Sequence, residues 1–235
     1  MRRFEQFKCV LRSWLAAFVR ARHLPFARPL DTIAVLAYGS LLTHPGTEIE
    51  PLIVRRIAVR TPFSVEYARY SGETRGGAPT VVAHRSGGPV RAEILVLQPQ
   101  IDLEEAKSLL WRRETRRVGT GKPYPEGSGP NAVLIGETQG LCGVEHVLHT
   151  DFNAEGKLPV IDPGSLAEAA IDSVSRADPG MDGISYLMEL KAARVETPLT
   201  QAYTDEILSR TGCATLPEAL EAVNDQNQAS SSQEP

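Results

Sequence analysis

The sequence lacks the features that mark two large classes of protein. It has no basic excess, because 25 lysines and arginines face 29 acidic residues and leave a formal net charge of −4. A nucleic-acid binder usually carries a clear excess of positive charge. No run approaches the roughly 20 apolar residues that a membrane-spanning helix needs. We therefore expect neither a nucleic-acid-binding protein nor a membrane-spanning one.

Cysteines are few and scattered along the chain. Cys9, Cys142 and Cys213 are odd in number and show no C-x-x-C spacing, so they predict neither a disulfide framework nor a zinc site. A reducing compartment fits this cysteine usage best. We expect a cytoplasmic protein, and nothing in the sequence specifies its oligomeric state.

The two ends of the chain differ from the part between them. Residues 1–30 carry seven basic residues against one acid, and their apolar residues recur at helical spacing, which predicts a basic amphipathic helix packed on the domain. Because Arg12 and Arg20 interrupt its apolar run, it does not resemble a signal peptide. The alternative for this helix is weak peripheral contact with an anionic membrane. Residues 224–235 are expected to form a disordered tail, which leaves 31–223 as one domain.

Strand patterns dominate the first half of this domain. Residues 33–37 predict a short buried strand, and apolar and polar residues alternate over 57–67, which is typical of a half-buried strand. Pro62 implies an edge or a bend there, because proline cannot donate to a strand ladder. Residues 80–84 and 90–97, joined by Gly87 and Gly88, predict a hairpin. Further strands are expected at 134–135 and 142–148.

Helical patterns follow these strands rather than alternating with them. They cover 102–117, 165–176, 183–194 and 199–211. Asp102 and Ser165 each precede a glutamate at capping-box spacing, which marks a helix start. Because strands and helices do not alternate regularly, we predict an α+β fold: a curved, mostly antiparallel sheet or small β-barrel with flanking helices.

Helix 102–117 places one carboxylate on an otherwise apolar face. That face carries Leu103, Ala106, Leu110, Glu114 and Arg117. A carboxylate that points inward is costly unless it is paired, and burial would raise its pKa toward the range that suits general acid/base catalysis. The equal alternative is a structural salt bridge from Glu114 to Arg113, Arg117 or another basic neighbour.

A tight turn at Tyr38-Gly39-Ser40-Leu41 directly follows the first strand. Glycine and serine allow the backbone N–H groups of such a turn to point into one concavity, where they can bind a carboxylate or an oxyanion. The alternative is a plain turn without a ligand.

Taken together, the strand, the turn and the helix resemble the γ-glutamylcyclotransferase-like superfamily. The segment Ile33 to Leu41 is similar to that family's opening strand and signature loop, and Leu110 to Glu114 is similar to the segment that holds its catalytic acid. Other segments agree with the family in order, at 61–65, 78–80, 88–95, 183–187 and 197–200. The resemblance covers roughly residues 33 to 210, and its strength lies in the order and spacing of short motifs.

The resemblance implies a small β-barrel and a γ-glutamyl cyclotransferase that needs neither a metal nor another cofactor. It implies that Tyr38, Gly39, Ser40 and Leu41 hold a small γ-glutamyl substrate and that Glu114 moves protons as 5-oxoproline forms. Family members often have an aromatic residue soon after the catalytic acid, and Tyr124 is the nearest candidate here.

The four arginines around Glu114, at 112, 113, 116 and 117, are unusual for the family and would suit an acidic substrate or product. The alternative to an enzyme is a non-catalytic small-molecule binding or interaction protein on the same barrel.

Overall fold

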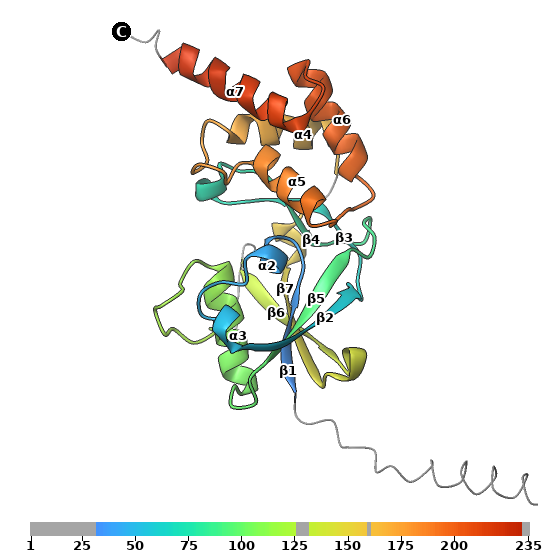
Figure 1. The fold of residues 1–235 in the computed structure, drawn as a ribbon, viewed down its shortest axis with the longest axis vertical. Coiled ribbons are helices and arrows are strands. Elements are labelled where there is room, and N and C mark those ends of the chain that lie inside the picture. Colours follow the sequence, from blue (N-terminus) through green and yellow to red (C-terminus); the bar gives the residue numbers. More distant parts are fainter. Residues whose placement is uncertain (1–31, 126–131, 159–160, 232–235) are drawn as a thin grey trace, which may run out of the picture. The chain divides into compact units, whose positions relative to one another are not determined.

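The protein is described by a computed structural model that covers residues 32–125, 132–158 and 161–231 (Figure 1). The amphipathic helix predicted for residues 1–30 lies outside the described residues. Within the described part, a sheet, a two-stranded ribbon and two sets of helices form an α+β fold.

A five-stranded sheet has the order β2-β5-β1-β7-β6. Its central strand, β1 (Ile33–Ala37), is buried along its whole length, as expected for a short apolar run covered on both faces. It pairs antiparallel with β5 (Arg91–Leu97) and parallel with β7 (His146–Phe152). The edge strands are β2 (Ile53–Arg60) and β6 (Val133–Gln139).

The strand predicted for residues 57–67 is divided in two by a bend. The first part ends in β2 at Arg60, and β3 (Val65–Tyr70) begins after the bend. The interruption expected at Pro62 is therefore confirmed. Beyond it, β3 leaves the large sheet and forms a separate antiparallel ribbon with β4 (Pro79–Ala83).

The hairpin predicted for residues 80–84 and 90–97 is wrong. β4 pairs with β3, whereas β5 pairs with β1 and β2. Gly87 and Gly88 do not form the predicted hairpin turn. They let the chain pass close to the backbone of β3, since a Cβ on Gly87 would lie 2.0 Å from the carbonyl oxygen of Val65. The sequence pattern showed the glycine pair but could not show which backbone it passes.

The predicted β-barrel is corrected to an open sheet. Among the described residues, β2 and β6 are unclosed edges, and one isolated bridge between Val65 and Gly88 is the link to the ribbon. The bend at Pro62 explains the difference, because it directs β3 away from the sheet that it would have to close.

Helix α3 (Leu103–Glu114) packs on β1, β6 and β7. Its predicted cap is confirmed, since the Asp102 side chain accepts a hydrogen bond of 2.8 Å from the N–H of Glu105. Ala106 and Leu110 are fully buried on its inner face. Glu114 is the last residue of the helix, so the packing of α3 determines where its carboxylate lies.

The remaining helices group together beside the β3–β4 ribbon (Figure 1). They are α4 (Pro163–Ser173), α5 (Gly183–Ala192), α6 (Thr200–Thr211) and α7 (Leu216–Ser231). Short helical segments are α2 (Ser40–Thr43), η2 (Glu50–Leu52), η3 (Glu73–Arg75), η4 (Leu141–Gly143) and η5 (Ala154–Gly156).

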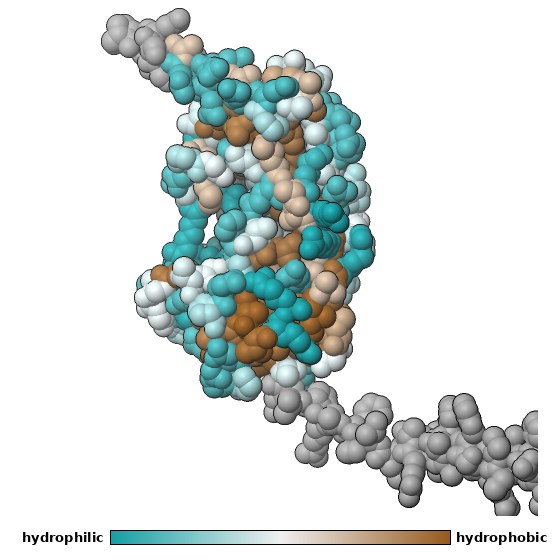
Figure 2. All heavy atoms as spheres, viewed as in Figure 1, coloured by the Kyte–Doolittle hydropathy of each residue, from teal (hydrophilic) through white to brown (hydrophobic). Residues whose placement is uncertain are grey.

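Several helix boundaries differ from the sequence predictions: α3, α4 and α5 each end two or three residues earlier than predicted, so Arg117 lies beyond the end of α3. Helix α4 is capped by Asp162 and begins with Pro163, whereas Ser165 donates to the Asp162 carboxylate rather than forming the predicted cap. Helix α7 continues to Ser231 through most of the segment expected to be a disordered tail. It buries Leu216, Ala219 and Val223 at helical spacing and exposes hydrophilic side chains (Figure 2). None of the described helices is long and apolar enough to cross a membrane.

We predict that Leu110→Ala destabilises the protein by about 2–5 kcal/mol, because it leaves a cavity between α3 and the sheet. Urea unfolding followed by circular dichroism measures this change. Val118→Ala is the control, since Val118 is 40% exposed. Equal stability of the two variants would contradict the assigned packing of α3.

Candidate functional site

The predicted turn leaves the buried strand β1 through Tyr38 and Gly39. The Tyr38 hydroxyl donates a hydrogen bond of 3.0 Å to the carbonyl oxygen of Thr150 in β7, and burial raises the pKa of this hydroxyl well above its usual range. Gly39 has a φ of 60°, which favours glycine. Helix α2 then begins at Ser40, with Leu41 buried beneath it.

Gly39 is required by its surroundings as well as by its backbone angle. A Cβ at this position would lie 3.0 Å from Cγ2 of Val81 and 3.1 Å from the hydroxyl of Tyr186. Tyr186 comes from α5 and is buried, and desolvation raises its pKa to about 12. The turn therefore packs tightly against both the ribbon and α5.

Two amide groups of the turn have no partner within the described part of the chain. The N–H groups of Ser40 and Leu41 occupy the first turn of α2, where a helix has no internal acceptor for them. These two groups are therefore available as donors within the described part of the chain.

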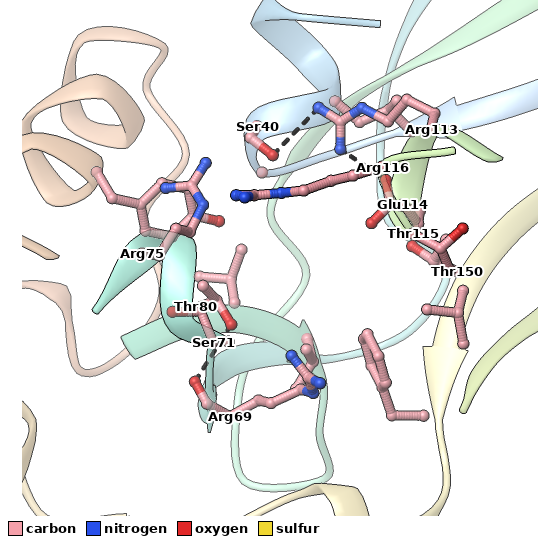
Figure 3. A pocket seen from close by; sticks show the side chains of 18 of the residues that line it. Ser40, Arg69, Ser71, Arg75, Thr80, Arg113, Glu114, Thr115, Arg116 and Thr150 are labelled. Carbon is pink, nitrogen blue, oxygen red and sulfur yellow. Dashed lines mark hydrogen bonds and ion pairs between the residues drawn. The ribbon is translucent and has the colours of Figure 1, made fainter. Parts of the chain in front are cut away.

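Arg113 joins the turn to the predicted acid. Its Nη1 lies 2.6 Å from Oε1 of Glu114, and its Nη2 donates to Ser40 Oγ at 3.3 Å and to the carbonyl oxygen of His44 at 2.7 Å (Figure 3). The salt-bridge alternative is thus present in the structure, with Arg113 as the partner. Arg117 instead lies over the ring of Trp111.

A cavity of about 420 Å³ lies over these residues. This volume is within the range of roughly 300–1,000 Å³ that is typical of small-molecule sites. Tyr38, Gly39, Ser40, Leu41 and Glu114 all line it, so the structure brings the predicted turn and the predicted acid together. The ribbon, η3, β7 and α5 supply the other walls.

Four guanidinium groups and one carboxylate line the cavity. The guanidinium groups belong to Arg69, Arg75, Arg113 and Arg116 (Figure 3), and Glu114 is the single acid among the described residues of the lining, so that four positive charges less one negative charge leave +3. Arg69 lies 4.2 Å from the ring centre of Phe152 and Arg75 lies 4.8 Å from that of Tyr186. Burial lowers the pKa of Arg69, and the nearby Glu114 opposes this effect. The cavity is suited to an anionic ligand.

Tyr124 is the predicted site residue that the structure does not bring to this cavity. Its backbone N–H donates to Ser108 Oγ at 3.1 Å, and its hydroxyl accepts from the N–H of Ile135 at 3.3 Å. It is not among the lining residues. Tyr124 instead ties the loop after α3 to the edge strand β6.

Arg112 and Arg116 have different surroundings although both come from the arginine cluster. Arg112 is 4% exposed and forms ion pairs of 2.9 Å with Glu48 and with Glu105. Arg116 follows the helix with a φ of 57°, and its guanidinium has no hydrogen bond or ion pair within the described residues. Only Arg113 and Arg116 of the four line the cavity.

Sequence reasoning missed Arg69 and Arg75. Arg69 follows a register shift in β3, between Tyr67 and Arg69, so simple alternation could not assign its side to the cavity. Arg75 lies in the short helix η3. The position of Arg69 just after a predicted strand was the available signal for that residue, and no pattern indicated Arg75.

No group of three or more His, Cys, Asp or Glu side chains that could hold a metal ion occurs in the described ranges.

Comparisons with known proteins give little beyond this geometry. No family model matches the chain, and no curated protein matches it significantly. A solved structure, the γ-glutamyl cyclotransferase specific to glutathione from yeast, matches with a TM-score of 0.42 and 13% sequence identity, over 83% of this chain and 99% of that one. A match at this level supports no argument about fold or function.

We predict that Gly39→Ala lowers stability more than Gly121→Ala. Both changes place alanine at a positive φ, which costs about 1–2 kcal/mol, but at Gly121 no atom of the described residues lies within 4 Å of the added carbon. The contacts with Val81 and Tyr186 should add about 1–3 kcal/mol at position 39. Urea unfolding compares the two variants, and equal losses would show that Gly39 is not closely packed.

Proposed function

We propose that this protein is a γ-glutamyl cyclotransferase. In this reaction the α-amine of a γ-glutamyl compound attacks the γ-carbonyl carbon of the same molecule. The new C–N bond closes the ring of 5-oxoproline, the bond to the leaving nitrogen breaks, and an amine or amino acid is released. No water is consumed, and no cofactor or metal is required because the nucleophile and the electrophile belong to one molecule.

The observation that supports this proposal most is the convergence of Glu114 and the turn on one polar cavity. The two segments are distant in the sequence, yet Arg113 contacts both Ser40 and Glu114. An acid beside two free amide N–H groups is the arrangement that amide cyclisation needs: one group to move a proton and others to bind a developing oxyanion.

In this proposal Glu114 takes a proton from the substrate's α-ammonium group and returns it to the leaving nitrogen. Arg113 contacts Oε1 of Glu114, and Oε2 has no hydrogen bond within the described residues. Arg113 thus orients the carboxylate while one oxygen stays available to the substrate. The N–H groups of Ser40 and Leu41 would support the oxyanion of the tetrahedral intermediate.

The competing class is a binding protein that uses the same cavity without turnover. The two classes differ in a direct observation, the release of 5-oxoproline from γ-glutamyl-alanine, γ-glutamyl-lysine or glutathione. A binding protein would be stabilised against heat by these compounds and would release none.

We predict that Glu114→Gln folds normally but loses 5-oxoproline formation by roughly 10²–10⁴-fold, which is the usual contribution of a general acid/base group. Glutamine can still accept a hydrogen bond from Arg113 through its amide oxygen, so the cavity should keep its shape. Turnover is measured as 5-oxoproline released, and the fold is checked by thermal unfolding.

Glu104→Gln is the matched control for this experiment. It makes the same chemical change on the same helix, but the Glu104 side chain is 76% exposed and pairs with Lys107 on the surface. It should keep full activity. Full turnover by Glu114→Gln would remove Glu114 from the mechanism.

A further inference from the structure

Among its described residues, the cavity has more positive than negative side chains, and this excess indicates which class of substrate it would bind. Of the four arginines that line it, Arg113 is neutralised by Glu114 through the 2.6 Å ion pair. Arg69, Arg75 and Arg116 have no ion pair to a protein carboxylate within the described residues. Three guanidinium groups therefore remain for a ligand.

The three groups reach the cavity from separate parts of the chain. Arg69 comes from β3, Arg75 from η3 and Arg116 from the end of α3, and Figure 3 shows their side chains pointing into the cavity. Phe152 and Tyr186 orient the first two through ring contacts. Because the groups are spread around the cavity, they suit several separate anionic groups rather than one.

Arg116 occupies a position where glycine is usual. The N–H of Arg117 donates to the carbonyl oxygen of Arg112 at 2.7 Å, which closes a Schellman motif with Arg116 in the left-handed conformation. A side chain at this position is strained, and such strain is common at ligand sites. The turn delivers the Arg116 guanidinium to the cavity beside Glu114.

A simple γ-glutamyl amino acid would not use all three groups. It carries two carboxylates, the α-carboxylate of the glutamyl part and that of the leaving amino acid. The cavity thus offers three unpaired guanidinium groups to a substrate with two carboxylates. We infer that the leaving group is an acidic amino acid, whose side chain gives the substrate a third carboxylate. This inference rests on the proposed cyclotransferase activity.

γ-Glutamyl-glutamate is the simplest compound of this class. Attack of its α-amine on the γ-carbonyl carbon forms 5-oxoproline, and the C–N bond to the second residue breaks as that nitrogen gains the proton. The products are 5-oxoproline and free glutamate, with no oxidant, reductant or water needed.

The test compares γ-glutamyl-glutamate with γ-glutamyl-glutamine, which differs only in an uncharged amide on the leaving side chain. We expect kcat/KM for 5-oxoproline release to be roughly tenfold higher for γ-glutamyl-glutamate, because a charge-assisted hydrogen bond replaces a neutral one. The preference should fall as salt is raised, since salt screens charges that are open to solvent.

The substitutions Arg116→Gln and Arg75→Gln should lower the ratio of kcat/KM for γ-glutamyl-glutamate to that for γ-glutamyl-glutamine. Each removes a guanidinium from the cavity while leaving Glu114 in place. The preference is a ratio measured on one protein sample, so a loss of folded protein cancels from it. Arg55→Gln is the matched control, since Arg55 is exposed on the edge strand β2. It should keep the ratio of the unaltered protein.

Each outcome gives a separate answer. The inference is supported if the preference for γ-glutamyl-glutamate falls in Arg116→Gln and Arg75→Gln but not in Arg55→Gln. Equal turnover of the two substrates overturns the inference and leaves the cyclotransferase proposal standing. No 5-oxoproline from these substrates, γ-glutamyl-alanine, γ-glutamyl-lysine or glutathione overturns the proposed function and the inference with it.

Discussion

The guanidinium of Arg113 is the contact on which the geometry of the cavity depends. It reaches from α3 to Ser40, 73 residues earlier in the chain, and it holds the Glu114 carboxylate at the same time. A guanidinium can do this because its donors point in fixed directions within one plane. A lysine would supply the charge but not the simultaneous contacts. Packing places α3 and the turn on the sheet, and this one planar group then links the turn to the acid.

Glu114 lies at an electrostatically unfavourable place for a carboxylate. The C-terminal end of a helix carries partial negative charge, which repels an acid there. Arg113 offsets this repulsion, and the surrounding arginines extend the compensation across the cavity. The local structure thus stabilises an acid at a helix end where the backbone alone would disfavour it.

Local patterns predicted individual elements better than their connections. The buried run of β1 and the capped start of α3 follow from residues that are close in sequence. The pairing of β4 with β3 depends on the bend at Pro62 and on the close passage of Gly87, which are contacts between distant segments. The barrel prediction failed at this point, because alternation within a strand does not specify its partner.

Local patterns also predicted the site only in part, because they do not show contacts between distant segments. Glu114 and the turn could be found because each interrupts or ends a regular pattern. Arg69 could not, because a register shift changes the side on which it lies. The resemblance suggests Tyr124 as the aromatic residue after the acid, but its hydroxyl accepts a hydrogen bond from the N–H of Ile135 in β6. Arginines of one cluster also differ in their surroundings, since Arg112 is buried and pairs with Glu48 and Glu105, whereas Arg116 has no ion pair within the described residues.

The left-handed backbone at Arg116 lowers the stability of the fold, whereas its side chain adds a positive charge to the cavity. Glycine would relax the end of α3 at this position but would remove a positive charge from the cavity. Selection for thermal stability alone would therefore favour glycine at position 116, and selection for an acidic ligand would favour arginine. A chain that keeps arginine there gives up part of its folding free energy for the charge it presents, and this trade-off is confined to a single residue beside the acid.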